Sequence, residues 1–207
     1  MDPKIYKVAS KTPTSENSGK KYFTDLDSKG VAQVTCGKGN TIFHVVAKSG
    51  NKQAAEEFLS THPSLAYQTN YAKGDTPLHV AARLGHLEFV TLLVNYAETN
   101  SLEEGINPVR KANVEKNTAL HEAVKNGHID IVRFLIEKDS VLASLTNNAG
   151  ESPLFLALDR KFSEIALFIL EKTFPICSFS GRNGMTVMHA AIIRNKNCKF
   201  SVYTGFI

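Results

Sequence analysis

One short phrase, a hydroxyl residue followed by apolar residues and usually by a histidine, occurs five times along the chain. Its hydroxyl residues are Thr41, Thr76, Thr118, Ser152 and Thr186. The intervals between them are 35, 42, 34 and 34 residues. A period of this length marks each copy as one supersecondary unit that cannot bury its apolar face alone, so the units are expected to stack.

Each phrase has the residues of a helix start. The threonine or serine can accept hydrogen bonds from the unpaired amides of the first turn. Pro77 and Pro153 stand just inside the helix, where a missing amide hydrogen is harmless. The histidine three residues after the cap, as at His79, is placed to reach back to the hydroxyl residue. A glycine is expected to end three of these short helices, at Gly50, Gly85 and Gly127.

A second, longer helix is predicted after each glycine. Apolar residues recur there at helical spacing and are expected to face the core. They are Leu87, Val90, Leu93 and Val94 in one repeat, Ile129, Val132, Leu135 and Ile136 in the next, and Ile165, Phe168 and Ile169 in the fourth. The predicted fold class is therefore all-α, a solenoid of stacked helix pairs joined by finger-like turns. It would have about four or five repeats, the last of them incomplete because only its first helix is recognisable.

The run from Asp75 to His86, Asp-Thr-Pro-Leu-His-Val-Ala-Ala-Arg-Leu-Gly-His, resembles the signature of the ankyrin repeat. Residues 117–128 resemble it nearly as well, and ankyrin-like units cover about residues 37–197. Residues 65–70 and 145–154 are similar to the plant ankyrin proteins of the accelerated-cell-death type. That resemblance implies a role in defence and stress signalling. Proteins of that family carry a membrane-spanning C-terminal domain after the repeats, and this sequence contains no such segment.

The sequence predicts three segments. Residues 1–36 are expected to hold a degenerate capping helix and a flexible stretch rich in Thr, Ser, Asn, Gly and Lys. Residues 37–197 form the ankyrin-repeat domain. Residues 198–207 are expected to be an irregular tail, because their apolar residues lack helical spacing. The extra residues of the 42-residue interval lie around residues 98–113 and predict a lengthened finger loop.

Composition and charge exclude several classes of protein. A formal net charge of +4 on 207 residues is too small for the dense basic patch of a nucleic-acid binder. Cys36, Cys177 and Cys198 are far apart, so we expect reduced thiols and neither a disulfide framework nor a zinc site. A secretory signal and a run of roughly 20 apolar residues are both lacking. The expected protein is cytoplasmic, with no membrane insertion by this chain itself.

Two features could suggest a catalytic or metal site: the repeated histidines, and residues 37–41, which superficially resemble a phosphate-binding loop. Neither predicts such a site. Stacked repeats place equivalent histidines in a ladder in which each is bonded locally, whereas a metal site needs three or four that converge. Six of the seven fall at repeat positions: His44, His79, His86, His121, His128 and His189. No nucleophile motif is present, and residues 37–41 lack the ending of a phosphate-binding loop. The prediction is a protein that is not an enzyme and that binds no metal or cofactor.

A basic residue predicted in the last turn of each first helix is the basis of the functional hypothesis. These residues are Lys48, Arg83, Lys125, Arg160 and Arg194. In stacked repeats they would line a concave groove as a basic ladder and attract an acidic peptide or protein surface. The alternative is a solvated face, because this position is often polar for solubility alone. By resemblance to ankyrin proteins the finger turns are a second candidate surface, with Tyr71, Lys73 and Lys116 as the candidate residues.

The predicted function is a non-enzymatic module that binds a protein partner through the groove and the finger turns. The resemblance to the plant family adds defence or stress signalling as its context. The alternative is the recognition part of a longer, membrane-anchored signalling protein. We expect a monomer that binds no nucleic acid, with the uncapped C-terminal end as the place where copies would associate.

Overall fold

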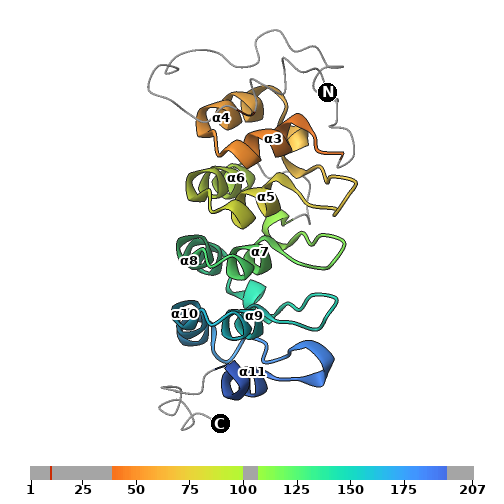
Figure 1. Ribbon diagram of the computed structural model, residues 1–207. Helices are drawn as coiled ribbons and strands as arrows, with labels where there is room; N and C mark the ends of the chain where they lie inside the picture. The colour runs from red at the N-terminus through yellow and green to blue at the C-terminus, as the bar shows by residue number, and fades with distance from the viewer. Residues whose placement is uncertain (1–9, 11–38, 100–106, 195–207) are drawn as a thin grey trace. The chain divides into compact units, whose positions relative to one another are not determined.

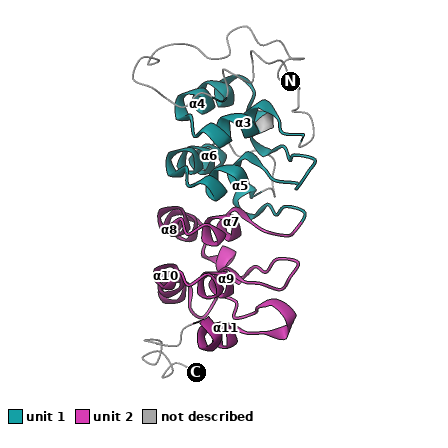
Figure 2. Cartoon of the chain, viewed as in Figure 1, with its two compact units in different colours: residues 1–114 teal, residues 115–207 magenta. Residues whose placement is uncertain are grey.

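The computed structural model describes Ser10, residues 39–99 and residues 107–194 (Figure 1). The capping helix predicted within residues 1–36 and the tail predicted at residues 198–207 lie outside the described residues. The chain divides into two compact units (Figure 2). Unit 1 comprises residues 1–114 and unit 2 comprises residues 115–207, and each is described by itself.

The described residues of unit 1 form two helix pairs, each made of a shorter first helix, a longer second helix and a 3₁₀ turn. Its elements are α3 (Ile42–Ser49), α4 (Lys52–Thr61), η2 (Pro63–Tyr67), α5 (Pro77–Leu84), α6 (Leu87–Thr99) and η3 (Pro108–Arg110). Helix α3 packs against α5, and α4 packs against α6. The first helices therefore form one layer, called here the first-helix layer, and the second helices form the second-helix layer.

Unit 2 repeats this arrangement. Its elements are α7 (Ala119–Lys125), α8 (Ile129–Lys138), η4 (Ser140–Ser144), α9 (Pro153–Asp159), α10 (Ser163–Thr173), η5 (Arg182–Gly184) and α11 (Val187–Arg194). Helix α9 packs against both α7 and α11, and α8 packs against α10. Irregular segments that lead into the first helices, called fingers here, extend beside the first-helix layer of each unit (Figure 1). The predicted all-α fold of repeated helix pairs is confirmed for the described residues.

Three phenylalanines fill the core of unit 1. The ring centroids of Phe43 and Phe58 are 5.0 Å apart, and those of Phe43 and Phe89 are 5.5 Å apart. All three side chains are fully buried. Ala47 and Ala81 on the first helices are also fully buried, and such small side chains let helices approach closely.

Three of the predicted core positions are wrong. Leu87 is exposed and Ile129 is only partly buried, because each is the first residue of its helix and lies at the margin of the apolar stripe. The buried positions are Phe89 and Ile131, two residues further along. Phe168 is also only partly buried, and the guanidinium carbon of Arg133 lies 5.2 Å from its ring centroid. The other predicted positions are buried: Val90, Leu93, Val94, Val132, Leu135, Ile136, Ile165 and Ile169.

The histidine of the repeated phrase closes a capping box, as predicted. The amide of Thr76 donates to Nδ1 of His79 at 3.2 Å, and the amide of His79 donates to Oγ1 of Thr76 at 3.4 Å. The threonine amide makes the same bond, at 3.1–3.3 Å, to His44, His121 and His189. In the fourth repeat Ser152 Oγ accepts a hydrogen bond from the amide of Phe155 at 3.1 Å.

In two repeats the capping histidine also bonds to the repeat that follows it. Nε2 of His44 lies 2.8 Å from the carbonyl oxygen of Asp75, and Nε2 of His121 lies 3.3 Å from that of Glu151. A carbonyl oxygen only accepts, so Nε2 carries the hydrogen and Nδ1 accepts from the threonine amide. The local bonding predicted for these histidines is therefore only half of what they do, because each also fastens one repeat to the next.

The residues inserted between the second and third phrases do not lengthen the finger. Helix α6 has 13 residues, against 10 in α4 and 10 in α8. The remaining extra residues lie between α6 and η3, where residues 100–106 fall outside the described part of the chain. Thr118 follows Asn113 by five positions, whereas Thr76 follows Asn70 by six. The predicted long finger loop is therefore wrong, and the insertion is at the end of a second helix.

Two different constraints act on glycines in this fold. Gly50 ends α3 with a φ of +68°, and a Cβ atom built there would lie 2.6 Å from Nδ1 of His86. Gly184 has a similar φ of +71°, but a Cβ atom there would meet nothing within 4 Å. Gly184 is thus constrained by backbone conformation alone, whereas Gly50 is constrained by conformation and by the ring that lies on it.

We expect Gly50→Ala to lower the free energy of unfolding by about 2–4 kcal/mol, from left-handed strain together with displacement of the His86 ring. Gly184→Ala is the matched control and should cost only about 1 kcal/mol, because it adds the strain alone. Urea denaturation followed by circular dichroism measures both. Equal losses of unfolding free energy in the two variants would show that the contact between the His86 ring and Gly50 does not contribute to stability.

The buried His44 predicts a loss of stability on acidification. Burial lowers the pKa of His44 below its ordinary value of 6.5, against the opposing influence of the Asp75 carbonyl and carboxylate. Below pH 6.5 the unfolded chain therefore takes up a proton that the folded chain does not, so stability falls with the pH. Urea denaturation between about pH 7.5 and pH 5 should show this slope. A His44→Gln variant should have a shallower slope, and an unchanged slope would contradict the assignment.

Candidate partner-binding surface

Four of the five predicted basic residues lie in the last turn of a first helix. Lys48, Arg83, Lys125 and Arg194 occupy that turn in α3, α5, α7 and α11. Arg160 does not, because α9 ends at Asp159 and Arg160 is its C-cap residue. The predicted position is therefore wrong for Arg160, and each basic residue is on or next to the first-helix layer of its own unit.

Arg83 is held by a buried carboxylate. Its Nη2 atom lies 2.8 Å from Oδ2 of Asp75, whose side chain is 1% exposed. Asn113 Nδ2 donates to the other carboxylate oxygen at 2.9 Å. Burial alone would raise the pKa of Asp75, but the bond from Asn113 and the charge of Arg83 together hold it below its ordinary value. Asp75 is therefore ionised, and it fixes Arg83 against the base of the finger.

A four-membered ion-pair network organises the first-helix layer of unit 2. Arg182 donates through Nη2 to both carboxylate oxygens of Asp159 at 2.9 Å and through Nη1 to Glu151 at 3.2 Å. Arg194 Nε lies 3.0 Å from Oδ1 of Asp159. The network joins α9, α11 and the finger between them. Sequence reasoning missed Arg182, because it is in a turn and has no counterpart in the other repeats.

The remaining basic residues are less constrained. Lys125 Nζ lies 3.9 Å from Glu115 Oε2, and that carboxylate is exposed, so the pair is weak. Lys48 and Arg160 are exposed, and neither forms an ion pair with any residue in the described ranges. Three of the five cations are therefore paired with carboxylates of their own unit, and two have no ion-pair partner among the described residues.

The fingers are rigid and present exposed side chains. In unit 1 the side-chain oxygen of Asn70 accepts from the amides of Lys73 and Asp75 at 3.1 and 3.2 Å. In unit 2 Asn147 does the same for two amides of its own finger, both at 3.0 Å. The predicted finger residues Tyr71, Lys73 and Lys116 are all exposed. The hydrogen bonds of these two asparagines were not predicted, although each asparagine stands five or six positions before the capping hydroxyl.

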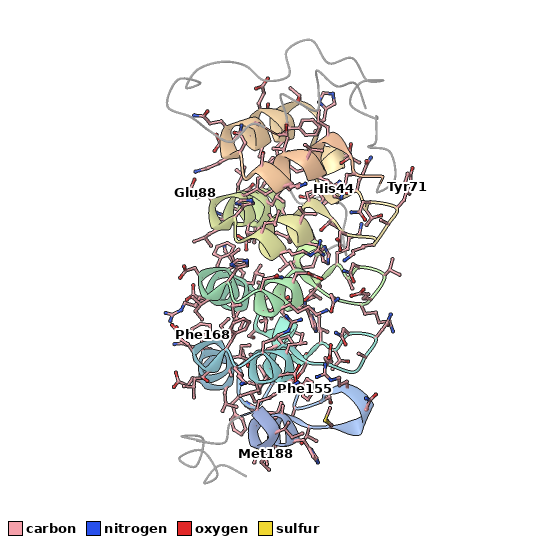
Figure 3. The ribbon with its side chains drawn as sticks, viewed as in Figure 1. His44, Tyr71, Glu88, Phe155, Phe168 and Met188 are labelled. Atoms are coloured by element: carbon pink, nitrogen blue, oxygen red, sulfur yellow. The ribbon has the colours of Figure 1, made fainter. Side chains whose placement is uncertain are left out.

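In unit 1 the two layers carry opposite charge. The exposed or partly exposed charged side chains on α3, α5 and the finger that precedes α5 are all cationic: Lys48, Lys73 and Arg83. Asp75 is the carboxylate there, and it is buried. The second helices α4 and α6 carry four carboxylates, those of Glu56, Glu57, Glu88 and Glu98, and the lysine Lys52. Glu88 and Tyr71 accordingly lie on opposite sides of unit 1 (Figure 3).

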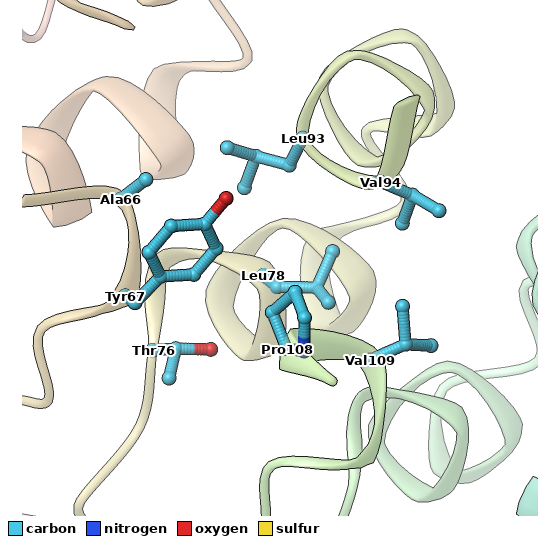
Figure 4. A pocket seen from close by; sticks show the side chains of 8 residues that line it. All are labelled: Ala66, Tyr67, Thr76, Leu78, Leu93, Val94, Pro108 and Val109. Carbon is cyan, nitrogen blue, oxygen red and sulfur yellow. The ribbon is translucent and has the colours of Figure 1, made fainter. Parts of the chain in front are cut away.

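The cavity in unit 1 is too small for a ligand. It has a volume of about 10 Å³ and is lined by residues of η2, α5, α6 and η3 (Figure 4). The Tyr67 hydroxyl is buried beside it without a hydrogen-bond partner in the described part of the chain. Burial and the neighbouring Tyr96 raise the pKa of Tyr67. A volume of this size holds one water molecule at most.

Within the residues that the structure describes, no three His, Cys, Asp or Glu side chains are grouped as metal ligands would be. Cys177 is a buried free thiol whose pKa is raised by burial, whereas Cys36 and Cys198 lie outside the described residues. None of the helices in the described ranges has the length and apolar character needed to cross a bilayer.

The sequence model of ankyrin repeats in three copies matches residues 18–103 and 100–178. Together with the helix pairs and capping boxes, this match shows that the chain belongs to the ankyrin-repeat family. The resemblance noted in the sequence is therefore confirmed.

Three relatives show how far the similarity extends. Protein ACCELERATED CELL DEATH 6 of Arabidopsis thaliana is 32% identical over 168 residues, covering 76% of this chain and 25% of that protein. Alpha-latrotoxin-Lhe1a of Latrodectus hesperus is 30% identical, covering 76% of this chain and 10% of the toxin. The Notch-regulated ankyrin repeat-containing protein of Homo sapiens is 33% identical, covering 53% of this chain and 92% of that protein. The chain thus spans a quarter or less of the first two.

We expect Arg83→Ala to lower the free energy of unfolding by about 2 kcal/mol, because buried Asp75 loses its charged partner. Lys48→Ala changes the corresponding residue of α3, which has no such partner, and should stay within about 0.5 kcal/mol of the unaltered protein. Chemical denaturation of the two variants measures the difference. A loss of the same size at Lys48 would mean that the pairing with Asp75 does not stabilise the fold.

Proposed function

We propose that the chain is a non-enzymatic interaction module whose first helices and fingers bind an acidic surface of a protein partner. The division of charge in unit 1 carries this proposal. Among the described residues of unit 1, the first-helix side presents cations, while the carboxylates lie on the second helices or, as with Asp75, are buried. A surface of one sign steers an oppositely charged partner and favours one binding face over the other.

The paired arginines support the proposal in a second way. Arg83 and Arg194 are each held by a carboxylate at 3.0 Å or less, so their side chains are already ordered. Side chains that are ordered in advance lose less conformational entropy when a partner binds. Lys48 and Arg160 would then supply charge that no described carboxylate neutralises.

For the biological context we propose plant defence or stress signalling. This rests on the similarity to the Arabidopsis protein over 76% of the chain. The alternative context is a longer, membrane-anchored signalling protein of which these repeats are the recognition part. The chain covers 25% of the Arabidopsis protein, and this small share supports the alternative of a longer protein. Immunoblots of fractionated plant tissue distinguish the two: a 22.7 kDa soluble band supports the first, and a larger membrane-associated band supports the second.

The charge proposal predicts the result of a matched pair of double substitutions. Lys48→Glu with Arg160→Glu reverses the two unpaired cations of the first-helix layers. Lys52→Glu with Lys172→Glu makes the same change in net charge on the second helices α4 and α10. We expect the first variant to capture at least about fivefold less partner from plant extract, a loss of roughly 1 kcal/mol, and the second to capture as much as the unaltered chain.

Quantitative mass spectrometry of the captured proteins gives the readout, at low and at physiological salt. Equal capture by both double variants and the unaltered chain would favour the solvated-face alternative. Arg83 is left intact in this experiment because its reversal would also expose Asp75 to an unbalanced charge and confuse binding with stability.

A further inference from the structure

The dipeptide Asn-Gly occurs twice in the sequence, at Asn126–Gly127 and at Asn183–Gly184, and both copies belong to unit 2. Asparagine is a thermolabile residue, and it is most labile before glycine. The backbone nitrogen of the glycine can then attack the side-chain amide carbon of the asparagine, because no Cβ atom of the glycine hinders the approach. The attack requires rotation of the backbone between the two residues. The contacts around each copy therefore set its reactivity.

The first copy is held by hydrogen bonds and by packing. The amide of Gly127, which contains the attacking nitrogen, donates to the carbonyl oxygen of Val124 at 3.1 Å. Nδ2 of Asn126 donates to the carbonyl oxygen of Glu122 at 2.8 Å. The ring of Phe162 lies on Gly127, where a Cβ atom would come within 2.9 Å of it. Rotation at this pair would break both hydrogen bonds and displace the ring.

The second copy is at the tip of the finger that precedes α11 (Figure 1). The amide of Gly181 donates to the carbonyl oxygen of Met185 at 2.9 Å, and one further bond, from the amide of Met185 to the carbonyl oxygen of Arg182 at 3.0 Å, spans the tip. Asn183 and Gly184 lie between these partners, and both are exposed. A Cβ atom at Gly184 would meet nothing within 4 Å. The side chain of Asn183 makes no hydrogen bond to any part of the chain that the structure describes.

The backbone conformation also distinguishes the two asparagines. Asn183 has a φ of +55°, in the left-handed region that L side chains rarely adopt. Asn126 has a φ of −109°, which carries no such strain. Rotation away from the folded conformation therefore relieves strain at Asn183, whereas at Asn126 it only breaks contacts.

We propose that Asn183 is a site of spontaneous deamidation, and that its conversion places a carboxylate next to Arg182. The nitrogen of Gly184 forms a bond to the side-chain amide carbon of Asn183, and the bond from that carbon to Nδ2 breaks. The proton of the attacking nitrogen leaves with Nδ2 as ammonia, so a five-membered succinimide ring remains. Water then opens the ring at one of its two carbonyl carbons and gives aspartate or isoaspartate. One water is consumed and one ammonia is released, without an enzyme or an oxidant.

The new carboxylate changes the charge balance of the ion-pair network in unit 2. In that network the cations Arg182 and Arg194 are matched by the carboxylates of Glu151 and Asp159. A carboxylate at position 183 adds an unmatched negative charge that competes for the guanidinium of Arg182. Arg194 is on α11 and bonds to the same Asp159, so weaker pairing in the network loosens α11.

Ageing of the full chain tests the proposed reaction. The protein is incubated at neutral and at mildly alkaline pH, either folded or in concentrated guanidinium chloride, and is then digested with trypsin for mass spectrometry. Trypsin cleaves after Lys125 and after Arg182, so each peptide begins with its Asn-Gly pair and shares any conversion during digestion. In the folded chain Asn183 should convert at least about tenfold faster than Asn126, a difference of about 1.4 kcal/mol in activation free energy. In guanidinium chloride the two rates should agree within about threefold, because both chain segments are then unfolded.

A substitution and the pH dependence check the mechanism. Gly184→Ala should slow the conversion of Asn183 by at least about tenfold and leave Asn126 unchanged, because the added Cβ atom hinders the attack. Both rates should rise with pH, since the attacking nitrogen must lose its proton. A ratio below about tenfold in the folded chain, or the same ratio in guanidinium chloride, would overturn the proposal, because the contacts would then not control the reaction.

Hydrogen exchange measured by mass spectrometry tests the effect on α11. Asn183→Asp introduces the aspartate product directly and should speed the exchange of residues 187–194 by at least about twofold. Asn126→Asp makes the same change in net charge at the other pair and is the matched control, so it should leave the exchange of that helix unchanged. Exchange in α11 that is the same in Asn183→Asp as in the unaltered chain would refute the coupling to Arg182.

Discussion

The hydrogen bonds of the capping histidine connect local structure to the stacking of repeats. His44 accepts from the threonine that starts its own helix and donates to the carbonyl of Asp75 in the next repeat. A ring with one accepting and one donating nitrogen can do both only in a single tautomer. The same ring therefore starts a helix and sets the distance to its neighbour. Without this link each helix pair would have an apolar face and no fixed position for the next pair.

Asp75 extends this connection from the core to the surface. Its carbonyl oxygen is bonded to His44, its amide to the side chain of Asn70, and its carboxylate to Arg83 and Asn113. Stacking, finger shape and the position of a surface cation thus all depend on one buried residue. Changes intended to alter binding at this finger will alter stability as well unless they avoid Asp75 and Arg83. The exposed Lys48, Lys73 and Tyr71 are free of that coupling, which makes them better reporters of recognition.

The sequence was sufficient for the features that depend on neighbours along the chain. The period of the phrase and the threonine–histidine spacing located the helix starts, because capping joins residues three positions apart. The sequence alone could not predict the contacts that join different repeats. The spacing that put Arg83 and Arg194 in one class could not show that Asp75 and Asp159 neutralise them. Periodicity likewise placed Leu87 in the core, since it cannot tell a helix end from its middle. The interval between the second and third phrases gave the length of the insertion, but it could not show which segment of the repeat contains the extra residues.

The contact between a glycine and an aromatic ring of the next repeat has a consequence for how such chains evolve. Gly50 receives the ring of His86, and Gly127 receives that of Phe162, so in both repeats a residue just after the first helix has no side chain and an aromatic ring of the next repeat lies on its backbone. A duplicated or borrowed repeat that carries such a ring just before its second helix can place it on either glycine. The fourth repeat has Lys161 instead, in a left-handed conformation with φ of +64°. Lys161 carries a Cβ atom at that position, so a ring could not lie on its backbone as closely as His86 lies on Gly50.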